Sequence, residues 1–198
     1  MYLNMTFDEI KEVLRDKTVG IAGCGGLGSN CAVALARTGM GKLVLADYDR
    51  VEESNLNRQY FLRDQIGEFK AEALRDMIHR IDDRISIETH IVNLDPESVQ
   101  TFFADCDVIV EAFDTAAAKQ MIIETVLADM PEKYIVSGQG VAGHGNNEMI
   151  ATQRHDRLSI VGDGMTEVSD EQPPLGPKVG AVANLQANIV LEILLNEE

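Results

Sequence analysis

The chain has 198 residues, of which 45% are hydrophobic, and it contains no Trp. This composition is typical of a globular protein and excludes a disordered chain. Its 17 Lys and Arg residues against 33 Asp and Glu residues give a net charge of −16. That charge argues against a surface for nucleic acid or for an anionic membrane, because both need basic patches.

Strand and helix signals alternate along the first two thirds of the chain, which predicts a parallel sheet with crossover helices. In chain order, the predicted elements are a helix at 8–16, a strand at 18–23, a helix at 26–39, a strand at 42–47, a helix at 70–81, a strand at 85–92, a helix at 96–104, a strand at 107–113, a helix ending at 130 and a strand at 134–138. A long polar loop, residues 48–69, joins the second strand to the third helix.

The pattern changes after Gly138. A glycine-rich stretch at 138–147 precedes two short predicted strands at 148–153 and 157–161, a flexible acidic segment at 162–177 and an apolar-faced helix at 179–195. We therefore expect one domain over residues 1–198 with an α/β fold. It would be a Rossmann-like, doubly wound, mostly parallel sheet with flanking helices and a short irregular C-terminal strand and helix region. The nucleotide-binding core would span about 18–138, and a carrier-binding or dimer region about 139–198.

No stretch reaches 18 uninterrupted apolar residues, and the first 17 residues mix acids and bases without an apolar signal core. We therefore expect a soluble, cytoplasmic protein that has no membrane partner. The three cysteines, Cys24, Cys31 and Cys106, include no C-x-x-C pair. Neither a disulfide framework nor a cysteine zinc site is expected from them.

The strongest local signal is GCGGLG, residues 23–28, between a predicted buried strand and a helix. Gly23, Gly25 and Gly28 fit the dinucleotide-binding pattern, and Gly26 lies in the same loop. Glycines let the backbone approach a phosphate, and the helix N-terminus supplies free N–H groups. The alternative is a tight strand-to-helix turn that binds no ligand.

Asp47 ends the second predicted strand, 24 residues after Gly23. A carboxylate at that position can accept hydrogen bonds from ribose hydroxyls. These two features alone fit an NAD-binding dehydrogenase as well as an ATP-binding enzyme.

The next stretch, DRVEESNLNRQ at 49–59, is followed by Lys70, twelve residues beyond Arg58. Together with GCGGLG, it resembles the ThiF/MoeB superfamily, whose members activate ubiquitin-like sulfur-carrier proteins and include the catalytic halves of ubiquitin-activating enzymes. The resemblance runs in order from about 18 to 195 and continues through Gly67, Lys70, Ala71, Asp114 and PKVGAVANLQANIVLEIL. The short length and the GDG…GP segment look most like the compact ThiF type of thiamin biosynthesis.

The resemblance implies an ATP-dependent and Mg²⁺-dependent adenylation of the C-terminal glycine of a carrier protein that ends in Gly-Gly. Such a transfer needs electrostatic stabilisation more than proton shuttling. Arg58 and Lys70 are the candidate cations, and Asp114 is the candidate ligand for Mg²⁺ on the triphosphate. Ser54, Asn55, Asn57 and Thr115 are candidate polar contacts to the nucleotide.

Each of these residues also has an ordinary structural alternative. Arg58 could pair with one of the many acids, Lys70 could be a solvated helix residue, and Asp114 could cap the next helix. The acidic segment at 162–172 could be a solvated loop, although we expect it to close over the carrier's tail. The order and spacing of these residues match the family's motifs, and this match favours the catalytic interpretation.

The sequence departs from the family in three places. The paired C-x-x-C motifs that bind structural zinc in many members are absent, so no structural zinc is expected. No cysteine follows Cys106, which excludes a covalent carrier link at the usual later position and implies a separate sulfur donor. The N-terminal arginine stretch that reaches the partner subunit's nucleotide is also missing, although a homodimer remains the expectation.

Three functions therefore stay open at the sequence level. The first is the adenylation of a ThiS-like carrier, or of a molybdopterin-type or other sulfur carrier. The second is an NAD-dependent Rossmann oxidoreductase. The third is a module that binds a nucleotide or a carrier without chemistry.

Overall fold

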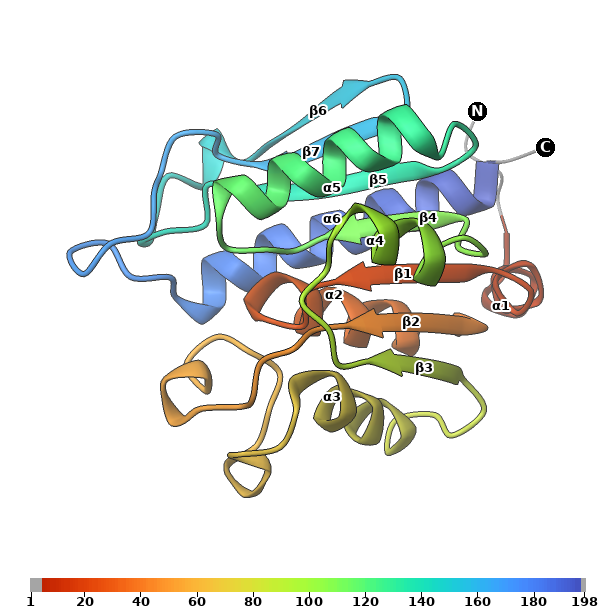
Figure 1. Ribbon diagram of the computed structural model, residues 1–198, viewed down its shortest axis with the longest axis horizontal. Helices are drawn as coiled ribbons and strands as arrows, with labels where there is room; N and C mark the ends of the chain where they lie inside the picture. Colours follow the sequence, from red (N-terminus) through yellow and green to blue (C-terminus); the bar gives the residue numbers. More distant parts are fainter. Residues whose placement is uncertain (1–4, 197–198) are drawn as a thin grey trace.

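The computed structural model describes residues 5–196, which form one seven-stranded sheet in the order β3-β2-β1-β4-β5-β7-β6 (Figure 1). The six strands from β3 to β7 along this order run parallel, and only β6, at one edge, is antiparallel to its neighbour. The strands are β1 (Thr18–Ala22), β2 (Lys42–Ala46), β3 (Ser86–His90), β4 (Val108–Glu111), β5 (Tyr134–Gln139), β6 (Ala151–His155) and β7 (Leu158–Gly162). The predicted doubly wound, mostly parallel α/β sheet is confirmed.

Helices cover both faces of the sheet, and each face has its own apolar core. The helices are α1 (Phe7–Leu14), α2 (Gly26–Arg37), α3 (Lys70–His79), α4 (Pro96–Phe102), α5 (Ala116–Asp129) and α6 (Gly176–Asn196). Along β2, Leu43 and Leu45 join the core under α2, α3 and α6, whereas Val44 and Ala46 join the core under α4 and α5. This alternation follows from the two-residue period of a strand. Both faces are therefore buried, as in other sheets built by crossover connections.

The C-terminal helix α6 completes the layer on the α2 side of the sheet. Val182, Ala183, Ala187 and Val190 of α6 are buried in the core that α2 also lines. By length and hydropathy alone, α6 could cross a membrane, but 44% of its apolar window is buried inside the protein. Its apolar residues are explained by that packing.

The parallel strands all point their C-terminal ends to one edge of the sheet. Figure 1 shows that the loops after β1, β2, β5 and β7 gather at this edge, while α1 and the last turns of α6 lie at the opposite edge. The order of strands reverses between β1, which precedes β2 and β3 on one side, and β4 on the other. Open α/β sheets bind their ligands at such a switch point.

The element boundaries agree with the sequence-based prediction within a few residues, with two corrections. The predicted strand at 148–153 starts only at Ala151, because a short 3₁₀ turn, Asn147–Met149, comes first. Helix α6 starts at Gly176, three residues before the prediction, because Pro177 is tolerated in a first helical turn. Strand β7 pairs with β5, so the C-terminal region belongs to the same sheet as the first five strands.

Candidate functional site

The glycine loop after β1 has the geometry of a nucleotide-binding turn. Gly23 has a φ of +92°, which a side chain rarely adopts, and a Cβ on Gly28 would lie 1.8 Å from the Gly23 carbonyl oxygen. Gly28 is therefore required by the close packing of α2 on β1. Around Gly25, in contrast, the nearest protein atom to an added Cβ would be Gln59 Nε2, at 3.8 Å. Gly25 leaves open space at the start of α2, where a phosphate could approach the backbone.

The Asp47 carboxylate supports this loop from the end of β2. Its Oδ2 accepts the Cys24 N–H at 2.6 Å, and its Oδ1 accepts the Asp49 N–H at 2.7 Å. Burial raises the pKa of Asp47, and the two N–H donors offset part of that rise. A carboxylate has about four acceptor positions, so Asp47 keeps capacity for two ribose hydroxyls.

Lys70, the first residue of α3, is buried and forms an ion pair with the half-exposed Asp49. Its Nζ donates to Asp49 Oδ2 at 2.7 Å, and only 8% of its side chain is exposed. The alternative of a solvated helix lysine is therefore wrong. Asp49 was not among the predicted site residues, although it belongs to the motif that contains Arg58. Asp49 holds the Lys70 ammonium beside the base of the glycine loop, since Asp49 also donates its N–H to Asp47.

Arg58 has no acidic partner among residues 5–196, so the alternative of a structural ion pair is wrong. Its Nη1 donates to the Ser54 carbonyl at 3.0 Å and to Asn57 Oδ1 at 2.8 Å. The rest of the guanidinium stays free to bind an anion. A Cβ on Gly26 would lie 3.6 Å from Arg58 Cγ, which places this side chain against the glycine loop.

The polar residues near Arg58 have more local contacts than the sequence suggested. Asn55 is buried, and its Oδ1 accepts the Glu52 N–H at 3.1 Å, so its side chain stabilises the turn. Asn57 orients Arg58, and the Ser54 hydroxyl donates to Glu52 Oε2 at 3.2 Å. A direct role for Asn55 and Ser54 in nucleotide binding stays a prediction.

Asp114 follows β4 and is exposed, and its carboxylate makes no hydrogen bond or ion pair within residues 5–196. The helix cap at this point is Thr115, whose Oγ1 accepts the Ala118 N–H at 3.3 Å. The alternative that Asp114 caps α5 is therefore wrong. Its neighbours border the glycine loop, since a Cβ on Gly23 would lie 3.0 Å from the Ala112 carbonyl oxygen.

The glycine loop is thus the centre of the predicted site. Asp47 bonds to it, Arg58 packs against it, the turn before Asp114 borders it, and Lys70 is linked to it through Asp49. Two carboxylates, of Asp47 and Asp114, and two cations, Arg58 and Lys70, thus surround the open N-terminus of α2. This arrangement suits a nucleoside triphosphate. A single free carboxylate also suits Mg²⁺, which proteins commonly hold through one or two carboxylates together with substrate phosphates. In the described part of the chain, no three His, Cys, Asp or Glu side chains gather into a metal site of their own.

The three cysteines are buried and do not resemble nucleophiles. Burial raises the pKa of Cys31 and of Cys106 to about 12, and it raises the pKa of Cys24 well above its ordinary value. A thiol that stays protonated is a poor nucleophile.

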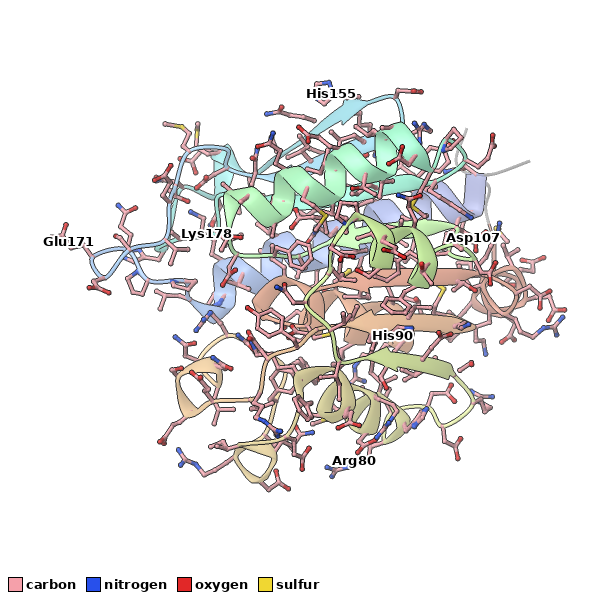
Figure 2. The ribbon with its side chains drawn as sticks, viewed as in Figure 1. Arg80, His90, Asp107, His155, Glu171 and Lys178 are labelled. Atoms are coloured by element: carbon pink, nitrogen blue, oxygen red, sulfur yellow. The ribbon has the colours of Figure 1, made fainter. Side chains whose placement is uncertain are left out.

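Two buried ion pairs near the same edge were missed by sequence reasoning. Glu111, the last residue of β4, pairs with Lys119 of α5 at 3.0 Å. Asp163, after β7, pairs with Lys178 of α6 at 2.7 Å. In Figure 2, Lys178 lies close to the body of the protein, whereas Glu171 lies at the outer end of the acidic loop. In the sequence, Glu111 lies inside the predicted strand at 107–113, and Asp163 comes two residues after the predicted strand at 157–161, so neither pairing was indicated.

The Asp163–Lys178 pair corrects part of the expectation for the acidic segment. Asp163 is 2% exposed at its side chain, and its carboxylate also accepts the N–H groups of Met165 and Thr166. Burial raises the pKa of Asp163, but the hydrogen bonds from Lys178, Thr166 and Met165 outweigh burial and hold it well below its usual range. Lys178 Nζ also donates to the Ala142 carbonyl at 2.8 Å. The base of the segment is therefore fixed, and Glu167, Asp170 and Glu171 beyond it are exposed.

Similarity to curated proteins points to enzymes that activate ubiquitin-like modifiers. The chain is 39% identical over 117 residues to ubiquitin-like modifier-activating enzyme 5 of Caenorhabditis briggsae, which covers 59% of this chain and 26% of that protein. It is 34% identical over 148 residues to the Bombyx mori protein of the same name, which covers 67% of this chain and 37% of that protein. The matches thus span only 26% and 37% of the length of these two relatives.

Solved structures share the fold at low sequence identity. The Escherichia coli tRNA N6-threonylcarbamoyladenosine dehydratase TcdA in complex with AMP matches with a TM-score of 0.84 and 20% identity, over 94% of this chain and 89% of that one. Its complex with ATP matches with a TM-score of 0.81 and 21% identity, over 93% and 89%. Escherichia coli MccB with ATP matches with a TM-score of 0.71 and 22% identity, over 93% and 57%.

The family model gives the broadest match, since it extends along almost the whole chain. The relatives and structures above do not single out the thiamin branch that the sequence suggested. The model of the ThiF family matches residues 2–198, and the chain therefore belongs to the ThiF family.

Proposed function

We propose that this chain binds Mg²⁺ and ATP and transfers AMP to the C-terminal carboxylate of a small ubiquitin-like protein that ends in Gly-Gly. Family membership, relatives that are named as activating enzymes, and fold neighbours that hold ATP or AMP all support this proposal. The observation that carries it is the position of Asp47, Arg58, Lys70 and the turn before Asp114 around one glycine loop.

In the proposed reaction, a carboxylate oxygen of the carrier attacks the α-phosphorus of ATP. The bond from that phosphorus to the oxygen bridging it to the β-phosphate breaks, and pyrophosphate leaves as an acyl-adenylate forms. The carrier's carboxylate is already ionised at neutral pH, so no general base is needed. The negative charge that builds on the phosphate oxygens needs cations, which Arg58 and Lys70 supply.

Arg58 and Lys70 act differently in this scheme. The Arg58 guanidinium has free N–H groups and can bind two phosphate oxygens at once. Lys70 is a point charge that Asp49 holds in place beside the glycine loop, within reach of the phosphates. Asp114 would hold Mg²⁺, which neutralises charge on the triphosphate and on the leaving pyrophosphate.

The proposed reaction stops at the adenylate. All three cysteines are buried, with pKa values raised by burial, so none is suited to form a thioester with the carrier. A separate donor would then supply sulfur. A homodimer and a cytoplasmic location remain part of the proposal.

The carrier itself is the finer part of the proposal. A ThiS-like carrier remains our first candidate, a molybdopterin-type carrier is the next, and the relatives add a ubiquitin-like modifier. A tRNA substrate, as the name of TcdA indicates for that enzyme, fits poorly with a net charge of −16. An NAD-dependent reaction would leave Arg58, Lys70 and Asp114 without a role.

The test is ATP–pyrophosphate exchange with Mg²⁺ and each carrier in turn. Each carrier is compared with a form that lacks its last glycine, and the Asp114→Ala variant serves as the site control. We expect exchange with one intact carrier, none with its truncated form, and a loss of about a hundredfold or more in the variant. ATP binding without exchange for any carrier would favour a binding module, and binding of NAD instead of ATP would overturn the proposal.

A further inference from the structure

Glu111, the last residue of β4, carries a carboxylate that is completely buried and fully hydrogen-bonded. Its Oε1 accepts the Phe113 N–H at 2.7 Å, and its Oε2 accepts the Ser137 hydroxyl at 2.5 Å from the neighbouring strand β5. Lys119 Nζ donates to both oxygens at 3.0 Å. Three donor groups thus make four hydrogen bonds, which occupy the acceptor positions of this one carboxylate.

Lys119 extends this network to the next strand and to α5. Its Nζ also donates to the Gly138 carbonyl at 2.7 Å, at the point where the glycine-rich segment begins. Its backbone N–H bonds to the carbonyl of Thr115, the residue that caps α5. The Glu111–Lys119 pair therefore joins the ends of β4 and β5 to the first turns of α5.

The turn between Glu111 and α5 is short, and it is anchored on both sides of Asp114. The Ala112 N–H bonds to the Ala22 carbonyl at 2.9 Å, the Phe113 N–H bonds to Glu111, and Thr115 is fixed as the cap. Asp114 alone in this turn has a side chain with no partner. The turn thus presents one free carboxylate on a backbone that hydrogen bonds anchor on both sides.

A buried ion pair is not needed for stability, because apolar residues of similar volume often replace one without loss. Here, the pair adds no net charge beside Asp114, so its effect on the site is geometric. We propose that Glu111 and Lys119 are positioning residues that set the place of the Asp114 carboxylate relative to bound Mg²⁺ and ATP. This inference rests on the proposed function, because it assigns Asp114 to the metal.

The test compares four variants: Lys119→Met, Lys119→Arg, Glu111→Gln and the double change Glu111→Gln with Lys119→Met. Because a single change leaves a buried charge without its partner, thermal unfolding is measured first, and the double variant removes both charges together. Lys178→Met is the matched control, since it breaks another buried ion pair at the same edge of the sheet that does not contact the Asp114 turn.

The readouts are kcat and the Mg²⁺ concentration for half-maximal ATP–pyrophosphate exchange, each at saturating ATP. We expect the folded double variant to lose about tenfold to a hundredfold in kcat and to need more Mg²⁺, because small misplacements of a catalytic group have effects of this size. The KM for ATP should change little. Lys119→Arg should recover most of the rate, and Lys178→Met should lower the Tm without shifting the Mg²⁺ midpoint.

The inference is overturned if the double variant melts lower but keeps the wild-type kcat and Mg²⁺ midpoint, since the pair is then merely structural. If the wild type binds Mg²⁺ and ATP but shows no exchange with any carrier, the proposed function fails. The inference is then decided by the Mg²⁺ dependence of ATP binding, measured by calorimetry in the wild type and the double variant. An unchanged dependence overturns it, and a wild type that does not bind ATP overturns both.

Discussion

Gly28 and Gly25 belong to the same loop, yet the structure predicts different effects when each is replaced by Ala. Gly28→Ala should reduce stability, and Gly25→Ala should reduce the affinity for ATP. A Cβ on Gly28 would lie 1.8 Å from the Gly23 carbonyl oxygen, and real Cβ atoms essentially never come closer than 3.0 Å to a neighbour. Helix α2 would have to shift from β1 by more than 1 Å. Overpacking at the upper end costs about 3 kcal/mol, and the better helix propensity of Ala returns about 1 kcal/mol. Gly28→Ala should therefore lower the free energy of unfolding by about 2 kcal/mol.

Gly25→Ala should leave folding almost unchanged, because no protein atom would lie within 3.8 Å of the added Cβ. The methyl group would instead occupy the space where a phosphate approaches the start of α2, so the affinity for ATP should fall by about tenfold or more. Urea unfolding followed by circular dichroism gives the first quantity, and calorimetry with Mg²⁺ and ATP gives the second. Equal stability of Gly28→Ala and the wild type, or unchanged ATP affinity in Gly25→Ala, would refute this interpretation of the loop.

Three further predictions concern charged residues. Arg58→Lys should lower kcat/KM for exchange by about tenfold or more, because a point charge replaces a planar fork that can bind two oxygens. An unchanged kcat/KM would show that Arg58 does not stabilise the transition state. Asp49→Asn should weaken exchange without abolishing it, since Lys70 keeps its charge but loses the partner that holds it, and a faster enzyme would show that the ion pair inhibits. Asp163→Asn should lower the free energy of unfolding by about 3–5 kcal/mol at pH 7, because it leaves Lys178 buried without its partner. Because the pKa of Asp163 is lowered on folding, its contribution is complete above the ordinary pKa of 3.8 and is lost as the pH falls below it. The difference in the free energy of unfolding between wild type and variant, measured with urea, should thus shrink below about pH 4. A difference that stays constant with pH would contradict a stabilising role for this ion pair.

Much of the fold was predictable because each strand and helix signal is local. The buried runs of β1, β2, β4 and β5, and the glycines on either side of α2, Gly23 and Gly39, mark these elements within a few residues. Strand β6 was harder, since its five residues are all exposed and their pairing with β7 depends on the hairpin rather than on an apolar pattern.

The candidate site was predictable where a motif fixes spacing, as for Gly23, Asp47 and Arg58. The partners of those residues were not, because contacts between distant segments leave no local pattern. Asp49 and Lys70 are 21 residues apart, and Asn55 contains the same amide as Asn57 but is used within its own turn. Glu111 reads as part of an apolar strand, and only the structure shows Lys119 and Ser137 around it.

The most direct test of the central claim is the intact mass of a Gly-Gly carrier after incubation with this protein, Mg²⁺, ATP and pyrophosphatase. The account predicts a carrier that is heavier by one AMP group, formed only when ATP and the terminal glycine are both present. A carrier of unchanged mass, across the ThiS-like, molybdopterin-type and ubiquitin-like modifier candidates and with ATP shown to bind, would contradict the account.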